Sequence, residues 1–148
     1  MKNNLKKIWL QDLFIGAWVS QYMEIPKRES CPMYVSAIFE NGDLYLDMPG
    51  NEGDPFEAEI GEIRGIAITP ETLRSFHFDE PDHNLFEKKC KGFKVVVSIF
   101  WHQHYKLIRA KIQHDNGGFQ FDDNIIFIHQ LQDFVFKSTR NPLTLEWL

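Results

Sequence analysis

Short stretches in the first half of the chain alternate between apolar and polar residues, and turns rich in glycine and proline separate them. A period of two is the pattern of a strand with one buried face. Asn41-Gly42, a strong hairpin signal, stands directly before such a stretch, and Gly16 interrupts another. The pattern predicts strands over residues 13–19, 33–39, 43–47, 56–63 and 66–68. We therefore expect an SH3-like curled sheet or small barrel over residues 10–68.

The same alternation returns in the second half, most clearly over residues 93–101. Asn116-Gly117-Gly118 predicts another hairpin turn. Residues 79–84 are largely polar and predict a turn. Further strands are expected over residues 105–112, 119–121 and 124–128. Together these strands predict a second β-meander over residues 86–128.

Two stretches carry helix signals. Thr69 is a good N-cap and Pro70 suits a first helical position, so a short helix is predicted near residues 70–77. Near the end of the chain, apolar residues recur three and four positions apart. This spacing predicts a second helix near residues 129–139, which Asn141-Pro142 ends. We expect this helix to pack across the second meander.

The predicted fold is α+β, mainly antiparallel β, in a single domain over residues 1–148. Its N-terminal β subdomain covers residues 10–68, and residues 69–148 supply the short helix, the meander and the C-terminal helix. Thirteen Phe and four Trp indicate a core filled with large rings. The positions expected in the core are Phe14, Trp18, Ile38, Leu46, Phe56, Ile60, Ile68, Leu73, Phe76, Val95, Val97, Ile99, Ile126, Ile128, Leu131, Phe134 and Val135.

The bulk composition is that of an ordinary globular protein, with 43% hydrophobic and 25% charged residues. No stretch approaches the roughly 20 apolar residues of a membrane span, so no membrane partner is expected. Cys31 and Cys90 show neither metal-site nor redox spacing, and two such cysteines favour reduced thiols in the cytoplasm. The net charge of −5 argues against a general nucleic-acid binder and leaves room for a local basic strip.

Three stretches follow a shared order: Phe14–Val19, Ile66–Leu73 and Phe127–Phe134. They resemble the "IGxWV", "IxLTPExL" and "VHQLQN" patterns of a family of small uncharacterised bacterial proteins that also occur on phage-like elements. The likeness covers nearly the whole chain, and the closing pattern is the specific one.

The chain departs from this family at Asp133, where the family has Asn, and at Phe134-Val135-Phe136, where it has Leu-Tyr-Phe. Residues 138–141 replace the usual "LTG" turn. No catalytic residue is established for the family, so the resemblance implies an architecture and not an activity.

The most distinctive polar group is His129-Gln130-Leu131-Gln132, with Phe134 one turn later. It stands where a predicted strand meets a predicted helix. His129 would serve as a general base if a cleft opened beside it. The favoured interpretation is structural: His129 and Gln130 cap the helix or bond a neighbouring strand, because buried polar groups need partners.

Two further groups of residues each admit a functional and a structural interpretation. His102, His104 and His114 would form a metal site only with more ligands than the spacing supplies, so a solvated turn is favoured and no cofactor is expected. A basic strip interleaved with aromatic residues suits single-stranded nucleic acid, although lysines on strands also protect sheet edges from aggregation, which is the favoured interpretation. The strip comprises Lys88, Lys89, Lys91, Lys94, Lys106, Arg109 and Lys111.

No catalytic motif accompanies these groups, which favours a non-enzyme. The leading hypothesis is a non-catalytic, cytoplasmic binding module that contacts another protein or a second copy of itself. The first alternative is a nucleic-acid-binding protein that uses residues 88–111. The second is a hydrolase or metal enzyme around His129 or around His102 and His104.

Overall fold

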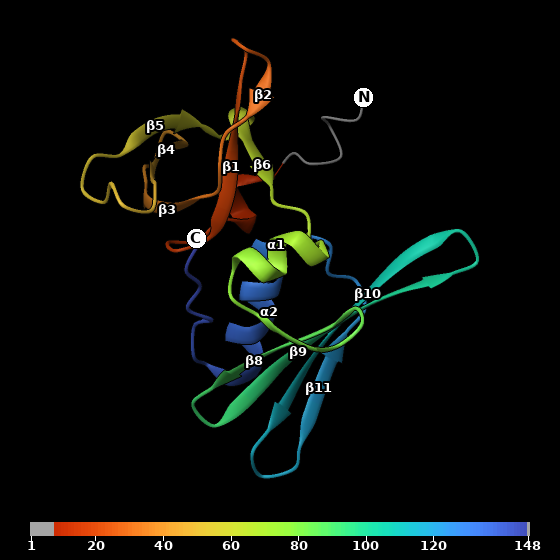
Figure 1. Ribbon diagram of the computed structural model, residues 1–148. Coiled ribbons are helices and arrows are strands. Elements are labelled where there is room, and N and C mark those ends of the chain that lie inside the picture. The colour runs from red at the N-terminus through yellow and green to blue at the C-terminus, as the bar shows by residue number, and fades with distance from the viewer. Residues whose placement is uncertain (1–7, 148) are drawn as a thin grey trace. The chain divides into compact units, whose positions relative to one another are not determined.

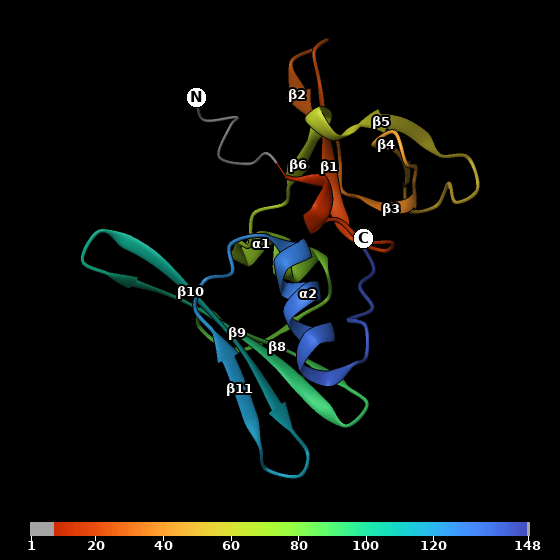
Figure 2. The same ribbon diagram turned by 180° about the vertical axis from the view of Figure 1, so that it is seen from behind.

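A computed structural model describes residues 8–147 and shows a mainly antiparallel α+β fold, as the sequence predicts (Figures 1 and 2). Its contacts divide the chain into two compact units, one ending at Ile66 and the other beginning at Ala67. The first unit is a curled half-barrel sheet, and the second joins a five-stranded meander to two helices.

The first unit is a six-stranded sheet with the order β2-β1-β3-β4-β5, in which β6 pairs with the other side of β1. Asn41-Gly42 makes the tight turn before β4, and Gly42 adopts the positive φ that this turn requires. The strands are β1 (Trp18–Met23), β2 (Arg28–Glu29), β3 (Met33–Ile38), β4 (Asp43–Asp47), β5 (Phe56–Glu59) and β6 (Ile63–Gly65).

Three strands predicted for residues 10–68 are wrong. The one over residues 66–68 is absent: β6 ends at Gly65, and Ala67 makes only an isolated bridge. The other two are wrong in extent. Residues 13–17 precede β1, because the 3-10 helix η2 (Leu10–Asp12) leads into a turn at Gly16 with a φ of 93°. Residues 60–62 form a second 3-10 helix, η3 (Ile60–Glu62), in place of the end of the fourth strand. The Glu62 side chain holds this turn by accepting the Glu59 N–H at 2.8 Å.

The core of the first unit is one cluster of buried apolar residues. Ile38 and Phe56 were expected there and are wrong, since they are 37% and 44% exposed. Ile38 closes β3 and Phe56 opens the end strand β5, where fewer neighbours cover a side chain. The core residues are Ile8, Leu13, Ala17, Val19, Met33, Val35, Leu44, Leu46, Ala58 and Ile63, with Phe14 and Ile60 packed against them.

The second unit is a five-stranded antiparallel meander in the order β11-β10-β9-β8-β7, with both predicted helices present. Thr69 caps the first helix as predicted, since its hydroxyl accepts the Thr72 N–H at 3.1 Å. The elements are α1 (Pro70–Ser75), β7 (Asp79–Asp82), β8 (Leu85–Cys90), β9 (Phe93–His102), β10 (Tyr105–His114), β11 (Phe119–Asp122) and α2 (Ile128–Thr139).

Two predictions for this unit are wrong. Residues 79–82 form strand β7 rather than a turn, because an edge strand tolerates Pro81, which has no N–H to donate. Residues 124–128 form no strand: Phe127 makes one isolated bridge with Ala67, and α2 begins at the next residue. Ile126, expected in the core, is therefore 52% exposed.

One face of the meander, which we call the inner face, is covered by the helices. Val95, Val97 and Ile99 alternate along β9 and are buried there. Figures 1 and 2 both show α2 beside this sheet, and α2 contacts β10. Trp101 continues the alternation, yet it is 65% exposed, because β9 runs on past the covered part of the sheet.

Candidate functional site

The His-Gln-Leu-Gln segment forms the first turn of α2. The Gln130 Oε1 atom accepts two backbone N–H groups, from Ile126 at 2.8 Å and from Phe127 at 3.0 Å. The chain thus turns from an extended segment into a helix around one side-chain oxygen. A glutamine at the third helical position commonly accepts the N-cap N–H in this way.

The other members of the segment face inward. His129 is only 4% exposed, and its ring stacks on Phe127 with a centroid distance of 5.7 Å and an interplanar angle of 14°. Leu131 and Gln132 are buried, and Phe134 is half-buried. A general base must reach a bound substrate, and a ring with so little open surface offers poor access for one.

Gln130→Ala should lower the free energy of unfolding by about 1–2 kcal/mol, since the Ile126 N–H and the partly buried Phe127 N–H lose their acceptor. Gln130→Glu keeps an acceptor oxygen and should stay close to the parent. Urea unfolding followed by circular dichroism measures both. Equal losses in the two variants would contradict the capping role.

The three candidate metal-ligating histidines are not brought together. His102 and His104 lie at the turn between β9 and β10, whereas His114 ends β10 and contacts Gln120 at 3.1 Å. Within residues 8–147 there is no group of three possible protein ligands for a metal ion. The structure therefore offers no site to which metal chemistry can be assigned in that range.

Alternation along the strands divides the basic strip between two faces. The uncovered face, which we call the outer face, bears Lys89, Lys94, Arg109 and Lys111, as the cross-strand register of β8, β9 and β10 fixes. Lys106 points the other way, and its Nζ donates to the Ile68 carbonyl at 3.2 Å. Two further members also lie off the outer face: Lys88 packs over the Phe78 ring, and Lys91 sits in the β8–β9 turn.

Two phenylalanines outside the predicted strip complete the outer face. Phe121 pairs directly with Lys111, and Phe119 pairs with Gln113, so both rings share the face of Arg109 and Lys111. They are 59% (Phe119) and 55% (Phe121) exposed, and their planes lie 19° apart with centroids separated by 6.4 Å. The sequence signal for these residues is the Phe-x-Phe alternation after a glycine turn. Only the register between β10 and β11 shows that the two rings lie beside Arg109 and Lys111.

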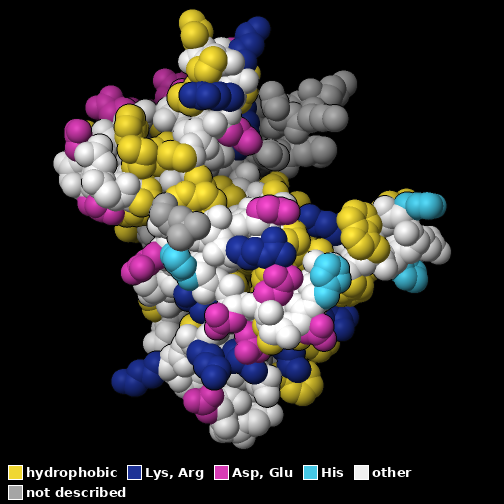
Figure 3. Space-filling model, viewed as in Figure 1, with side chains coloured by type: hydrophobic (Ala, Val, Ile, Leu, Met, Phe, Trp, Pro, Cys, Tyr) yellow, Lys and Arg dark blue, Asp and Glu magenta, His cyan; other side chains and the backbone are white. Residues whose placement is uncertain are grey.

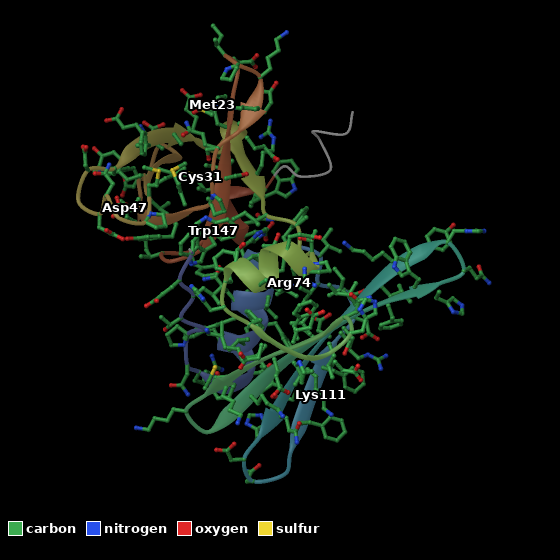
Figure 4. The ribbon with its side chains drawn as sticks, viewed as in Figure 1. Met23, Cys31, Asp47, Arg74, Lys111 and Trp147 are labelled. Atoms are coloured by element: carbon green, nitrogen blue, oxygen red, sulfur yellow. The ribbon has the colours of Figure 1, made fainter. Side chains whose placement is uncertain are left out.

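Cations lie over both rings. The Arg109 guanidinium is 5.1 Å from the Phe121 centroid, and the Lys111 ammonium is 4.9 Å from that of Phe119. Figure 4 labels Lys111 on this sheet. Such contacts contribute on the order of 0.5–1 kcal/mol at exposed sites, too little to bury the rings. The result is an open surface that carries π faces and positive charge together.

Part of that charge is already paired. Arg109 donates two hydrogen bonds to Asp123, at 2.6 and 2.9 Å, and these bonds lower the pKa of the Asp123 carboxyl. Lys94 pairs with Glu87 at 3.3 Å. Lys111 makes no ion pair with any described side chain. Lys89, which is exposed on the same face, makes none either, so the positive charge open to a ligand lies on Lys89 and Lys111.

The remaining chemistry of the chain is sparse. In the first unit, a groove of about 740 Å³ is lined by Phe39, Tyr45 and several carboxylates, including Asp43 and Glu59, which face each other across β4 and β5. Burial raises the pKa of the Cys90 thiol, which keeps that thiol protonated and unreactive. Neither feature assembles a nucleophile with a base.

No helix in the described range is long and apolar enough to cross a bilayer. Comparison of the chain with protein-family models, with curated proteins and with solved structures finds no match.

Proposed function

We propose that this chain is a non-catalytic module that binds single-stranded nucleic acid on the outer face of β8–β11. The observation that carries the proposal is the exposed pair Phe119 and Phe121, side by side on a sheet face with Arg109 and Lys111 against them. Proteins that hold single strands combine such stacking rings with cations that follow the phosphates. This ranks the first alternative from the sequence above a protein partner.

The outer face leaves aromatic rings exposed to solvent beside positively charged side chains. Phe119 and Phe121 each leave more than half of their surface in water, while Val95, Val97 and Ile99 on the opposite face of the same sheet are buried. A nucleobase that stacks on such a ring contributes about 1–3 kcal/mol. Lys111 and Arg109 supply the charge for neighbouring phosphates, and the net charge of −5 resides largely elsewhere in the chain. Two unpaired cysteines fit a cytoplasmic location for this role.

The test is a fluorescence-anisotropy titration of the whole chain with labelled oligothymidylate and oligouridylate of about ten nucleotides, a length within the usual range of such sites. We expect binding at about 50 mM salt that weakens steadily as salt rises, since phosphate contacts release counterions. Absence of binding at low salt would reject the proposal. Self-association of the free chain through the same face, seen by sedimentation, would then restore the protein-partner hypothesis.

Asp123→Asn should raise affinity for the oligonucleotide roughly threefold or more, because it frees the Arg109 guanidinium for phosphate. Asp133→Asn is the matched control, since it removes the same charge from an ion pair with Lys137 on α2, outside the outer face. The same anisotropy titration compares the two. An equal gain in both variants would mean that net charge, and not this surface, sets the affinity.

A further inference from the structure

The β9–β10 hairpin runs on beyond the strands that flank it. Pairing with β8 stops at Ser98 and pairing with β11 stops at Ala110, while β9 and β10 continue to pair as far as His102 and Tyr105. Residues 100–107, which we call the arm, are thus a two-stranded ribbon whose two edges have no neighbouring strand. Figures 1 and 2, two opposite views, both show this hairpin extending past β8 and β11.

The arm continues the outer face without a break. Leu107 pairs with Phe100 and Tyr105 pairs with His102, and both pairs have the same alternation as Arg109 and Lys111. Tyr105 is 70% exposed and Phe100 is 40% exposed. Figure 3 shows hydrophobic and histidine side chains together over the end of this hairpin.

The reverse side of the arm carries Trp101, which is 65% exposed and therefore as open as Tyr105. The next residue on that side, Lys106, donates to the Ile68 carbonyl and is held back toward the helices. The two sides of the arm thus carry rings of similar exposure, Tyr105 on one side and Trp101 on the other. Only the side with Tyr105 is continuous with the outer face.

We propose that the arm extends the nucleic-acid site, with Tyr105 and Phe100 stacking bases that lie beyond those on Phe119 and Phe121. This inference rests on the proposed function. Two observations support the nucleic acid over another occupant. The arm is continuous with the proposed surface, and the chain has no acidic residue from Lys88 to Lys111, so nothing along the arm repels phosphates.

The geometry also sets a length requirement. From Tyr105 to Gln113, β10 spans roughly 27 Å at the usual rise of a strand. A strand of about four nucleotides lies at the low end of known sites and reaches either the Phe119–Phe121 pair or the arm. A strand of about ten nucleotides reaches both. The arm therefore contributes to affinity only for the longer ligand.

The experiment compares oligothymidylates of about four and about ten nucleotides, each titrated against the whole chain and its Tyr105→Ala, Tyr105→Phe and Trp101→Ala variants. We expect Tyr105→Ala to weaken binding of the longer ligand about tenfold and to leave the shorter one nearly unchanged. Tyr105→Phe keeps a ring and should retain the parent affinity. Trp101→Ala, on the reverse side, should match the parent for both ligands.

Two outcomes would disprove the role of the arm without affecting the proposal for the outer face. One is a Tyr105→Ala affinity equal to that of the parent for the longer oligonucleotide. The other is an equal loss of affinity in Tyr105→Ala and Trp101→Ala. If the parent chain bound neither oligonucleotide, both the proposed function and the role of the arm would be rejected. Thermal melts of each variant show whether the hairpin substitutions alter folding.

Discussion

Replacement of both Phe119 and Phe121 with alanine will weaken binding of a ten-nucleotide single strand by about a hundredfold or more. Each stacked base contributes about 1–3 kcal/mol, and the double variant removes both platforms. Because the two rings are more than half exposed and pack mainly on each other and on cations, their removal should cost little stability. Anisotropy titration gives the affinity, and a thermal melt gives the stability.

Phe136→Ala is the control for this pair. Phe136 is 46% exposed on α2, away from the outer face, and its loss removes a similar area of exposed ring. Its oligonucleotide affinity should equal that of the parent chain. A hundredfold loss in this variant as well would show that binding does not depend on the outer face, and unchanged binding in the double variant would disprove the stacking role.

Phe86→Ala will lower the free energy of unfolding by about 3–5 kcal/mol, the usual cost of deleting a buried ring. Phe86 is fully buried on β8, where it faces inward opposite Val97 in the core of the second unit. A loss of this size is a large part of the stability of a small domain, so the variant should unfold at much lower urea. Urea unfolding followed by circular dichroism measures the change.

Phe121→Ala is the matched comparison, because it deletes the same ring from the opposite face of the same sheet. Its free energy of unfolding should stay within about 0.5 kcal/mol of the parent, as for most exposed positions. Similar losses from Phe86→Ala and Phe121→Ala would mean that the outer face is part of the packing, and the description of it as an open surface would be wrong.

Local signals predicted the local features of this fold. Thr69 and Pro70 mark the start of α1 because capping depends only on neighbouring residues. Asn41-Gly42 marks the turn before β4 for the same reason. The predictions failed where long-range strand pairing determines the structure. Strand β7 contains Pro81 and is tolerated because it lies at the edge of the sheet. Residues 124–128 have the sequence of a strand, but only Phe127 pairs, in its isolated bridge with Ala67.

The candidate site shows the same limit. A run of basic residues in the sequence suggested one strip, but strand alternation sends Lys94 and Arg109 to the outer face and Lys106 to the inner one. Phe119 and Phe121 lie downstream of that run, and only the pairing of β10 with β11 brings them beside Lys111. Composition could therefore suggest the kind of surface, whereas cross-strand register determines its members.

The inner and outer faces of β9 and β10 differ in how well they tolerate amino-acid substitution. Val95 and Val97 are locked among buried neighbours, so their substitution puts folding at risk. One position along, residues such as Lys94 and Lys111 support no core, and their replacement leaves the scaffold intact. Evolution can thus retune what this sheet holds by altering every second residue. Relatives that share the ligand should agree on both sets of positions, and relatives that have lost it should agree only on the inward set.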